Sequence, residues 1–151
     1  MDEIKVISGL DFNSIASQYS FDKRLIVKDY YLVVILYLIK DIEGIYFNGG
    51  TALNKIFLDH PRLSEDIDFT LTRDQKEVRD EILDILKKSN LFKEITEGKD
   101  VEGFLRMIVN YDSELGKGEI FIDLNKRGKL ILPSEYIISN TSISHLFQCL
   151  Q

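Results

Sequence analysis

The chain has 151 residues, of which 44% are hydrophobic and 29% charged, and its formal net charge is -6 at pH 7. This length suits a single domain over residues 1–151 with a sizeable core, and the composition excludes a disordered chain. The acidic balance excludes a protein that coats nucleic acid through its overall field, although a local basic surface remains compatible with it.

Cys149 is the only cysteine, which excludes an internal disulfide and the thiolate-rich metal sites of zinc fingers. The N-terminal segment MDEIKVISGLDF carries acidic residues and no long apolar stretch, so it predicts neither a signal peptide nor a transit peptide. The most apolar run, YYLVVILYLI at 30–39, is well short of the roughly 20 residues that cross a bilayer. We therefore expect a cytoplasmic protein that makes no use of a membrane.

The first predicted element is a helix over residues 22–43, with Asp22 or Ser20 as its N-cap and Gly44 at its C-terminal end. Its nearly continuous apolar surface predicts that most sides of the helix are buried. A short apolar strand, IYFN at 45–48, should follow.

That strand runs into Gly49 and Gly50, and a short helix is predicted from Thr51 to about Asp59, before Pro61. The next stretch, EDIDFTL, alternates strictly from Asp66 and predicts a strand with one apolar and one polar face.

The second half predicts one helix and then strands. Thr72 and Gln75 form a capping box for a helix over 73–89. Three strands are expected in FKEITE, GFLRMIVNY and GEIFIDL, with the loop DSELGKG joining the last two as a hairpin. Residues 127–151 fit neither template. The elements together predict an α/β fold with a mixed, largely antiparallel sheet flanked by helices.

Three acidic residues fall on polar faces of predicted strands. Asp66 and Asp68 are two positions apart, so their backbones are about 7 Å apart and their side chains lean the same way. Asp123 alternates with the apolar residues of EIFIDL and should face the same side. Such carboxylates suit a pair of magnesium ions that bind a phosphate substrate, although an Asp-x-Asp pair by itself is also typical of a solvated strand face.

Gly49 and Gly50 lie between a strand and a helix N-terminus, where backbone N–H groups can approach a phosphate and the Thr51 hydroxyl can add a donor. A Gly-Gly turn alone is also typical of a tight connection. The two acids about fifteen residues later favour a phosphate site.

The stretch GGTALNKIFLDHPRLSEDIDF resembles the motif of the nucleotidyltransferase superfamily with a DNA polymerase β-like palm. It is most similar to the AbiEii/AbiGii toxin-type family, whose pattern is Gly-Gly-Thr-x-Leu followed by Arg-x-Ser-x-Asp-Ile/Leu-Asp. The residues that match this pattern are Gly49, Gly50, Thr51, Leu53, Arg62, Ser64, Asp66, Ile67 and Asp68.

This resemblance implies an enzyme that transfers a nucleoside monophosphate from an NTP to a hydroxyl on RNA or protein, with two Mg²⁺ ions as cofactors. It implies that a toxin of this kind is partnered by an antitoxin protein. The implied catalytic and metal-binding residues are Asp66, Asp68 and Asp123, and the implied nucleotide-binding residues are Gly49, Gly50, Thr51, Arg62 and Ser64.

Other interpretations of these residues remain. Arg62 can instead pair with Glu65 or Asp59, and Ser64 can shape a turn. Longer family members carry a C-terminal helical domain for which 151 residues leave no room, so a non-catalytic remnant that binds a nucleotide or a partner protein is the alternative function. A third interpretation is a domain whose acids bind calcium or magnesium for stability alone.

Overall fold

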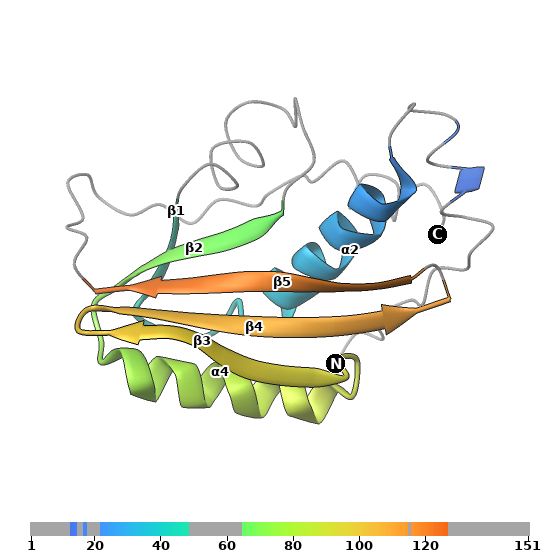
Figure 1. Ribbon diagram of the computed structural model, residues 1–151. Coiled ribbons are helices and arrows are strands. Elements are labelled where there is room, and N and C mark those ends of the chain that lie inside the picture. Colours follow the sequence, from blue (N-terminus) through green and yellow to red (C-terminus); the bar gives the residue numbers. More distant parts are fainter. Residues whose placement is uncertain (1–12, 15–16, 18–21, 49–64, 115, 127–151) are drawn as a thin grey trace.

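The computed structural model describes residues 13–14, 17, 22–48, 65–114 and 116–126. Their strands form one sheet in the order β1-β2-β5-β4-β3, in which β2 and β5 are parallel and the other neighbouring pairs antiparallel. The predicted mixed, largely antiparallel sheet with helices is therefore confirmed (Figure 1). The elements are α2 (Lys23–Leu38), β1 (Ile45–Asn48), β2 (Asp66–Leu71), α4 (Gln75–Ser89), β3 (Glu94–Val101), β4 (Phe104–Ser113) and β5 (Gly116–Asn125).

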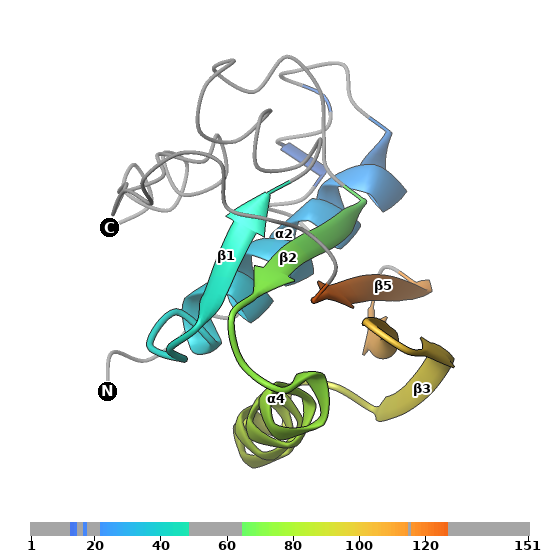
Figure 2. The ribbon, with the colours of Figure 1, turned by 90° about the vertical axis from the view of Figure 1, so that its left-hand side faces the viewer.

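One face of this sheet forms the core with α2 and α4. In Figure 2, α2 and α4 lie on the same side of β3 and β5. Helix α2 contacts β5, and α4 contacts β4 and β5. No described helix covers the opposite face. The alternating strand residues that are buried beneath the helices are Ile67, Phe69, Leu71, Leu105, Met107, Val109, Ile120, Ile122 and Leu124.

The helix predicted over 22–43 is shorter in the structure. Asp22 is its N-cap and accepts a hydrogen bond of 2.8 Å from the Arg24 backbone N–H, as one of the two predicted caps. The helix ends at Leu38 rather than residue 43, because the chain turns to bury both Ile39 and Ile42 in the core. Gly44 takes a φ of 76° directly before β1, six residues past the end of the helix, so it does not cap the helix.

The capping box predicted for the second helix is wrong. Asp74 is the N-cap of α4, and its Oδ1 accepts hydrogen bonds from the backbone N–H groups of Lys76 and Glu77. The backbone N–H of Thr72 instead donates a hydrogen bond to the carbonyl oxygen of Gly44, the residue before β1. The Gln75 side chain is buried against β3, so neither member of the predicted pair is available to cap.

The three C-terminal strands are confirmed, with longer bounds. β3 continues to Val101 past a register shift between Glu97 and Asp100, beyond the predicted end at residue 97. β4 and β5 form the predicted hairpin, but their pairing extends to Ser113 and Gly116, and the connection is shorter than DSELGKG. The predicted helix 51–59 and residues 127–151 lie outside the described residues. Among those described, no helix is long and apolar enough to cross a membrane.

Candidate active site

One row of register partners crosses the uncovered face of the sheet. Asn48 of β1 is the partner of Asp68 of β2, which is in turn the partner of Asp123 of β5. Arg106 of β4 is the partner of Asp123 on its other side. Because hydrogen-bonded strands lie about 4.8 Å apart, the row brings an amide, two carboxylates and a guanidinium together.

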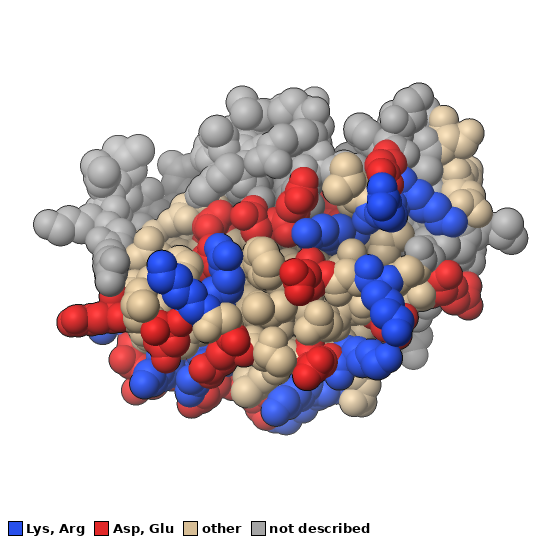
Figure 3. Space-filling model, in the orientation of Figure 1, with Lys and Arg blue, Asp and Glu red and all other residues tan. Residues whose placement is uncertain are grey.

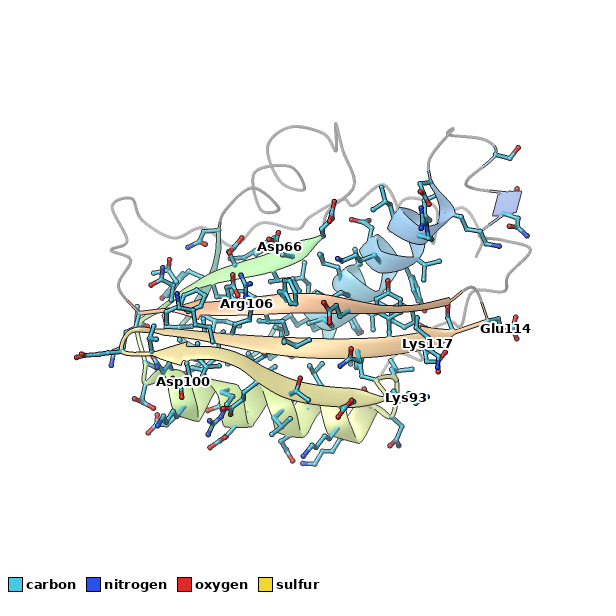
Figure 4. All side chains as sticks on the ribbon, in the orientation of Figure 1. Asp66, Lys93, Asp100, Arg106, Glu114 and Lys117 are labelled. Atoms are coloured by element: carbon cyan, nitrogen blue, oxygen red, sulfur yellow. The ribbon has the colours of Figure 1, made fainter. Side chains whose placement is uncertain are left out.

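Asp66 lies one row away, at the start of β2, where its register partner is Phe121. Asp66 and Asp68 are half-buried, while the apolar residues between and beyond them point into the core. Figure 4 shows Asp66 on β2 and Arg106 over the neighbouring strands of the same sheet. The strand alternation predicted for Asp66, Asp68 and Asp123 is therefore present in the structure.

Arg106 holds the Asp123 carboxylate with two hydrogen bonds. Its Nε donates to Oδ1 and its Nη2 donates to Oδ2, each over 2.7 Å. The Asp123 side chain is only 8% exposed, whereas the Arg106 side chain is 34% exposed. The guanidinium also lies over the Phe121 ring, 4.6 Å from its centroid. A planar, bidentate pair of this kind fixes the carboxylate in one orientation.

The surroundings of this row shift the pKa values of Asp68 and Arg106. Burial raises the pKa of Asp68, and the carboxylates of Asp66 and Asp123 raise it further, while Arg106 opposes them. The hydrogen bonds to Asp123 raise the pKa of Arg106, so the guanidinium stays charged. At Asp68 the repulsion from the two neighbouring carboxylates thus outweighs the attraction of Arg106. A bound divalent cation would remove that repulsion.

Two of the three acids, Asp66 and Asp68, could bind magnesium in the positions that they have in the structure. Asp66 and Asp68 supply half-buried carboxylates on one strand face, and carboxylate oxygen is a ligand that Mg²⁺ prefers. An ionised carboxylate has about four acceptor positions, so each Asp123 oxygen keeps acceptor capacity beyond its bond to Arg106. Among the described residues, no three His, Cys, Asp or Glu side chains are already arranged around one metal position.

A shallow pocket of about 330 Å³ lies on the same face, beside this row. It extends from Arg106 toward Phe104 and Asn125, which are register partners one row further along β4 and β5. Its other two lining residues are Lys99 and Val101 of β3. The pocket therefore begins at the residue that holds Asp123.

Arg106 was not among the residues predicted for the site. Its alternation with Leu105 and Met107 placed it on the polar face of its strand, but only the pairing of β4 with β5 shows that it reaches Asp123. Asn48 was also missed; its side-chain amide donates to the Thr70 hydroxyl. The predicted nucleotide-binding residues lie outside the described residues: Gly49, Gly50, Thr51, Arg62 and Ser64.

Two crystal structures from H. pylori share this fold. One protein, described as a nucleotidyltransferase, superposes with a TM-score of 0.61 at 19% identity, over 80% of this chain and 53% of its own. JHP933 superposes with a TM-score of 0.61 at 17% identity, over 85% of this chain and 56% of its own. The chain thus shares the fold of both proteins, and it spans about half the length of either H. pylori chain.

The sequence profile described as "Nucleotidyl transferase AbiEii toxin, Type IV TA system" matches residues 32–148. This range is most of the chain, and the chain belongs to that family. No protein of curated function is a significant match. The family resemblance expected from the Gly-Gly-Thr and Asp-Ile-Asp motifs is confirmed.

Proposed function

We propose that this chain is a metal-dependent nucleotidyltransferase, which transfers a nucleoside monophosphate from an NTP to a hydroxyl on RNA or protein. The observation that carries the proposal is the register pairing of Asp68 with Asp123 on the uncovered face of the sheet. Asn48, the partner of Asp68 on its other side, directly precedes Gly49 in the sequence. The acids and the start of the proposed phosphate-binding turn are thus on adjoining strands.

In this proposal, Asp66, Asp68 and Asp123 hold two magnesium ions. When bound, the ions lower the pKa of the attacking hydroxyl and neutralise charge on the departing pyrophosphate. The residues proposed to bind the triphosphate through backbone N–H groups and polar side chains are Gly49, Gly50, Thr51, Arg62 and Ser64.

Arg106 and Asp123 have distinct roles in this scheme. Asp123 is the acid proposed to accept the proton of the attacking hydroxyl, because it belongs to the strand on the far side of Asp68 from β1. Arg106 is a positioning residue, since its two hydrogen bonds fix the orientation of the buried carboxylate. A fixed base is more effective than a freely rotating one.

The family of this chain also supports a biological role. Its members are described as toxins of type IV toxin-antitoxin systems, and we propose that the chain acts inside the cell in such a pair, with an antitoxin protein as its partner. Residues 1–151 are proposed to form one domain.

Incubation of the protein with each labelled NTP, Mg²⁺ and total RNA tests the proposal. Transfer of label by the parent and by the matched surface variant Asp84→Ala, but not by Asp66→Ala or Asp68→Ala, supports it. Asp84 is a suitable control because it lies on α4 and pairs there with Lys88. No transfer by the parent, with NTP binding intact, would identify the non-catalytic remnant instead. Metal binding that is independent of NTP would identify a structural site.

A further inference from the structure

Phe121 is an aromatic residue on the uncovered face of β5, two positions before Asp123. Its neighbours in sequence, Ile120 and Ile122, are buried in the core, whereas Phe121 itself is half-buried. Its register partner on β2 is Asp66. Packing of the core therefore does not account for an aromatic ring at this position, beside two acids of the proposed site.

The ring of Phe121 contacts the guanidinium of Arg106. The Cζ atom of Arg106 lies over the ring, 4.6 Å from its centroid, within the roughly 6 Å at which the face of an aromatic ring attracts a cation. The same guanidinium donates two hydrogen bonds of 2.7 Å to Asp123. Arg106 on β4 therefore has two partners on β5, an aromatic face and a carboxylate.

Gly98 on β3 leaves space for the aliphatic stem of Arg106. The pairing of β3 with β4 shifts between Glu97 and Asp100, so Gly98 and Lys99 together lie opposite Arg106. A Cβ at position 98 would lie 3.3 Å from the Cγ atom of Arg106, which is closer than side chains normally approach. The φ of Gly98 is not positive, so the backbone conformation does not require glycine. A glycine inside a strand weakens it and often marks a close approach, as it does here.

Arg106 also has carboxylates other than Asp123 within electrostatic reach. Figure 3 shows basic and acidic side chains interspersed over this side of the molecule. The hydrogen bonds to Asp123 raise the pKa of Arg106 most, and the charges of Asp66 and Asp68 raise it further. Without other contacts, the rotatable bonds of the side chain would let the guanidinium turn toward the acids of β2.

The acids of β2 and the guanidinium are on opposite sides of Asp123. Arg106 is the register partner of Asp123 on β4, and Asp68 is its register partner on β2. A guanidinium that stays on the β4 side orients the Asp123 carboxylate and leaves the β2 side to a divalent cation. A guanidinium that turned toward Asp68 would compete with that cation, because both neutralise the same carboxylates.

We propose that Phe121 and Gly98 are positioning residues for Arg106. They keep its guanidinium on the β4 side of Asp123, and so leave both acids of β2 to bind metal. Phe121 acts through the attraction of its ring for the guanidinium, and Gly98 acts by leaving space for the stem. This inference rests on the proposed transferase function, in which the acids hold magnesium. It adds β3, the last strand in the order of the sheet, to the elements that support the site.

Hydrogen exchange of the Arg106 Nε–H, followed by NMR in the metal-free protein, tests the contact with Phe121. The signal is identified by its absence from Arg106→Gln. Phe121→Leu keeps an apolar side chain without the ring and should speed exchange about two- to fivefold, as expected for loss of a cation–π contact at a partly exposed site. Phe121→Tyr should exchange as the parent does.

Phe92→Leu is the matched control for removal of a ring. Phe92 is a partly buried phenylalanine that contacts Tyr31, and its substitution should leave the exchange of the Arg106 Nε–H unchanged. Equal exchange in Phe121→Leu and the parent would overturn the proposal.

A double-mutant cycle on Mn²⁺ affinity, measured with an NTP that has a non-hydrolysable α–β linkage, shows whether Phe121 acts through Arg106. Phe121→Leu should weaken Mn²⁺ binding about two- to fivefold, and Gly98→Val should also weaken it. Neither substitution should weaken binding further in Arg106→Gln, which has no guanidinium to position. Equal losses with and without Arg106 would show a purely structural role and would overturn the proposal.

The transfer assay separates this inference from the function on which it rests. If the parent transfers nucleotide and Phe121→Leu binds Mn²⁺ as tightly as the parent, the positioning role is overturned and the transferase is retained. If the exchange rates and the Mn²⁺ cycle follow the prediction but the parent transfers nucleotide to no hydroxyl, the positioning role is retained and the transferase is overturned.

Discussion

Arg106 donates two hydrogen bonds of 2.7 Å to Asp123, its register partner on the neighbouring strand. The Asp123 carboxylate is buried and the Arg106 side chain is one-third exposed. The ion pair therefore extends from a buried position to the solvent on the uncovered face of the sheet. Asp123 also neighbours Asp68. The same carboxylate therefore belongs both to an ion pair and to the proposed metal site.

Arg106→Met should reduce the free energy of unfolding by roughly 2 kcal/mol, because it leaves the buried Asp123 carboxylate without its charged donors. We place the effect below that of a fully buried pair, since solvent reaches Arg106. Urea denaturation measures it. The surface variant Lys88→Met, which removes an exposed pair with Asp84, should stay within about 0.5 kcal/mol of the parent.

A double variant, Arg106→Met/Asp123→Leu, should be more stable than Arg106→Met alone, because it also removes the unpaired charge. If Arg106→Met lowers the free energy of unfolding no more than Lys88→Met does, this account of the ion pair is contradicted. A double variant that is less stable than Arg106→Met would also contradict it.

Asp68→Asn should raise the melting temperature at pH 7 by about 1–2 °C, the shift expected for a gain of about 0.5 kcal/mol when solvent screens the repulsion at a half-buried carboxylate. Burial and the two neighbouring carboxylates raise the pKa of Asp68 in the folded state. The folded state therefore holds that proton more tightly than the unfolded state does between the two pKa values. The stability due to Asp68 falls as the pH rises through this window, and the ionised group is unfavourable above it.

Thermal unfolding with and without Mg²⁺ and NTP completes this test. The parent should be stabilised by the ligands and Asp68→Asn should not, because binding to the folded state alone raises stability. A melting temperature below that of the parent in Asp68→Asn at pH 7, without added metal, would show that the carboxylates do not repel one another.

Asp74→Ala should lower the free energy of unfolding by about 1 kcal/mol, the usual cost of removing an N-cap. Thr72→Ala should cost less, since the Thr72 backbone N–H that bonds to Gly44 is unaffected by the substitution. Chemical denaturation of the two variants side by side gives the comparison. If Thr72→Ala lowers the free energy of unfolding more than Asp74→Ala does, the result would support the capping box predicted from the sequence.

Gly118→Ala should destabilise the β4–β5 hairpin by about 1–3 kcal/mol, as overpacking does. A Cβ at this position would clash with the Tyr111 side chain, at its hydroxyl oxygen and its ring carbon Cζ. Tyr111 cannot move easily, because its ring stacks on Tyr31 with the centroids 4.5 Å apart. Differential scanning calorimetry measures the loss, and an unchanged melting temperature would show that the ring has room to shift.

The strand faces could be predicted from local pattern, because alternation depends only on neighbours along the chain. The polar positions of Asp66, Asp68 and Asp123 followed from it. The ion pair between Arg106 and Asp123 could not be predicted in the same way. It requires β5 to lie between β2 and β4 in the sheet, and strand order is decided by packing between segments distant in sequence.

The helix ends illustrate the same limit. Thr72 and Asp74 are both good N-caps by residue type, and the choice between them depends on Gly44, a partner 28 residues away from Thr72. The early end of α2 likewise reflects the burial of Ile42 in the core. Helical periodicity alone carries no information about either contact.

Titration with Mn²⁺, followed by electron paramagnetic resonance in the presence and absence of an NTP with a non-hydrolysable α–β linkage, tests the central claim most directly. The account predicts that the parent and the control Asp84→Asn bind Mn²⁺ more tightly with the nucleotide than without it. Asp68→Asn should bind at least about tenfold more weakly than the parent, because loss of even an outer-shell partner of a metal ligand typically costs that much. Equal Mn²⁺ affinity in Asp68→Asn and the parent, or affinity that does not change with the nucleotide, would contradict it.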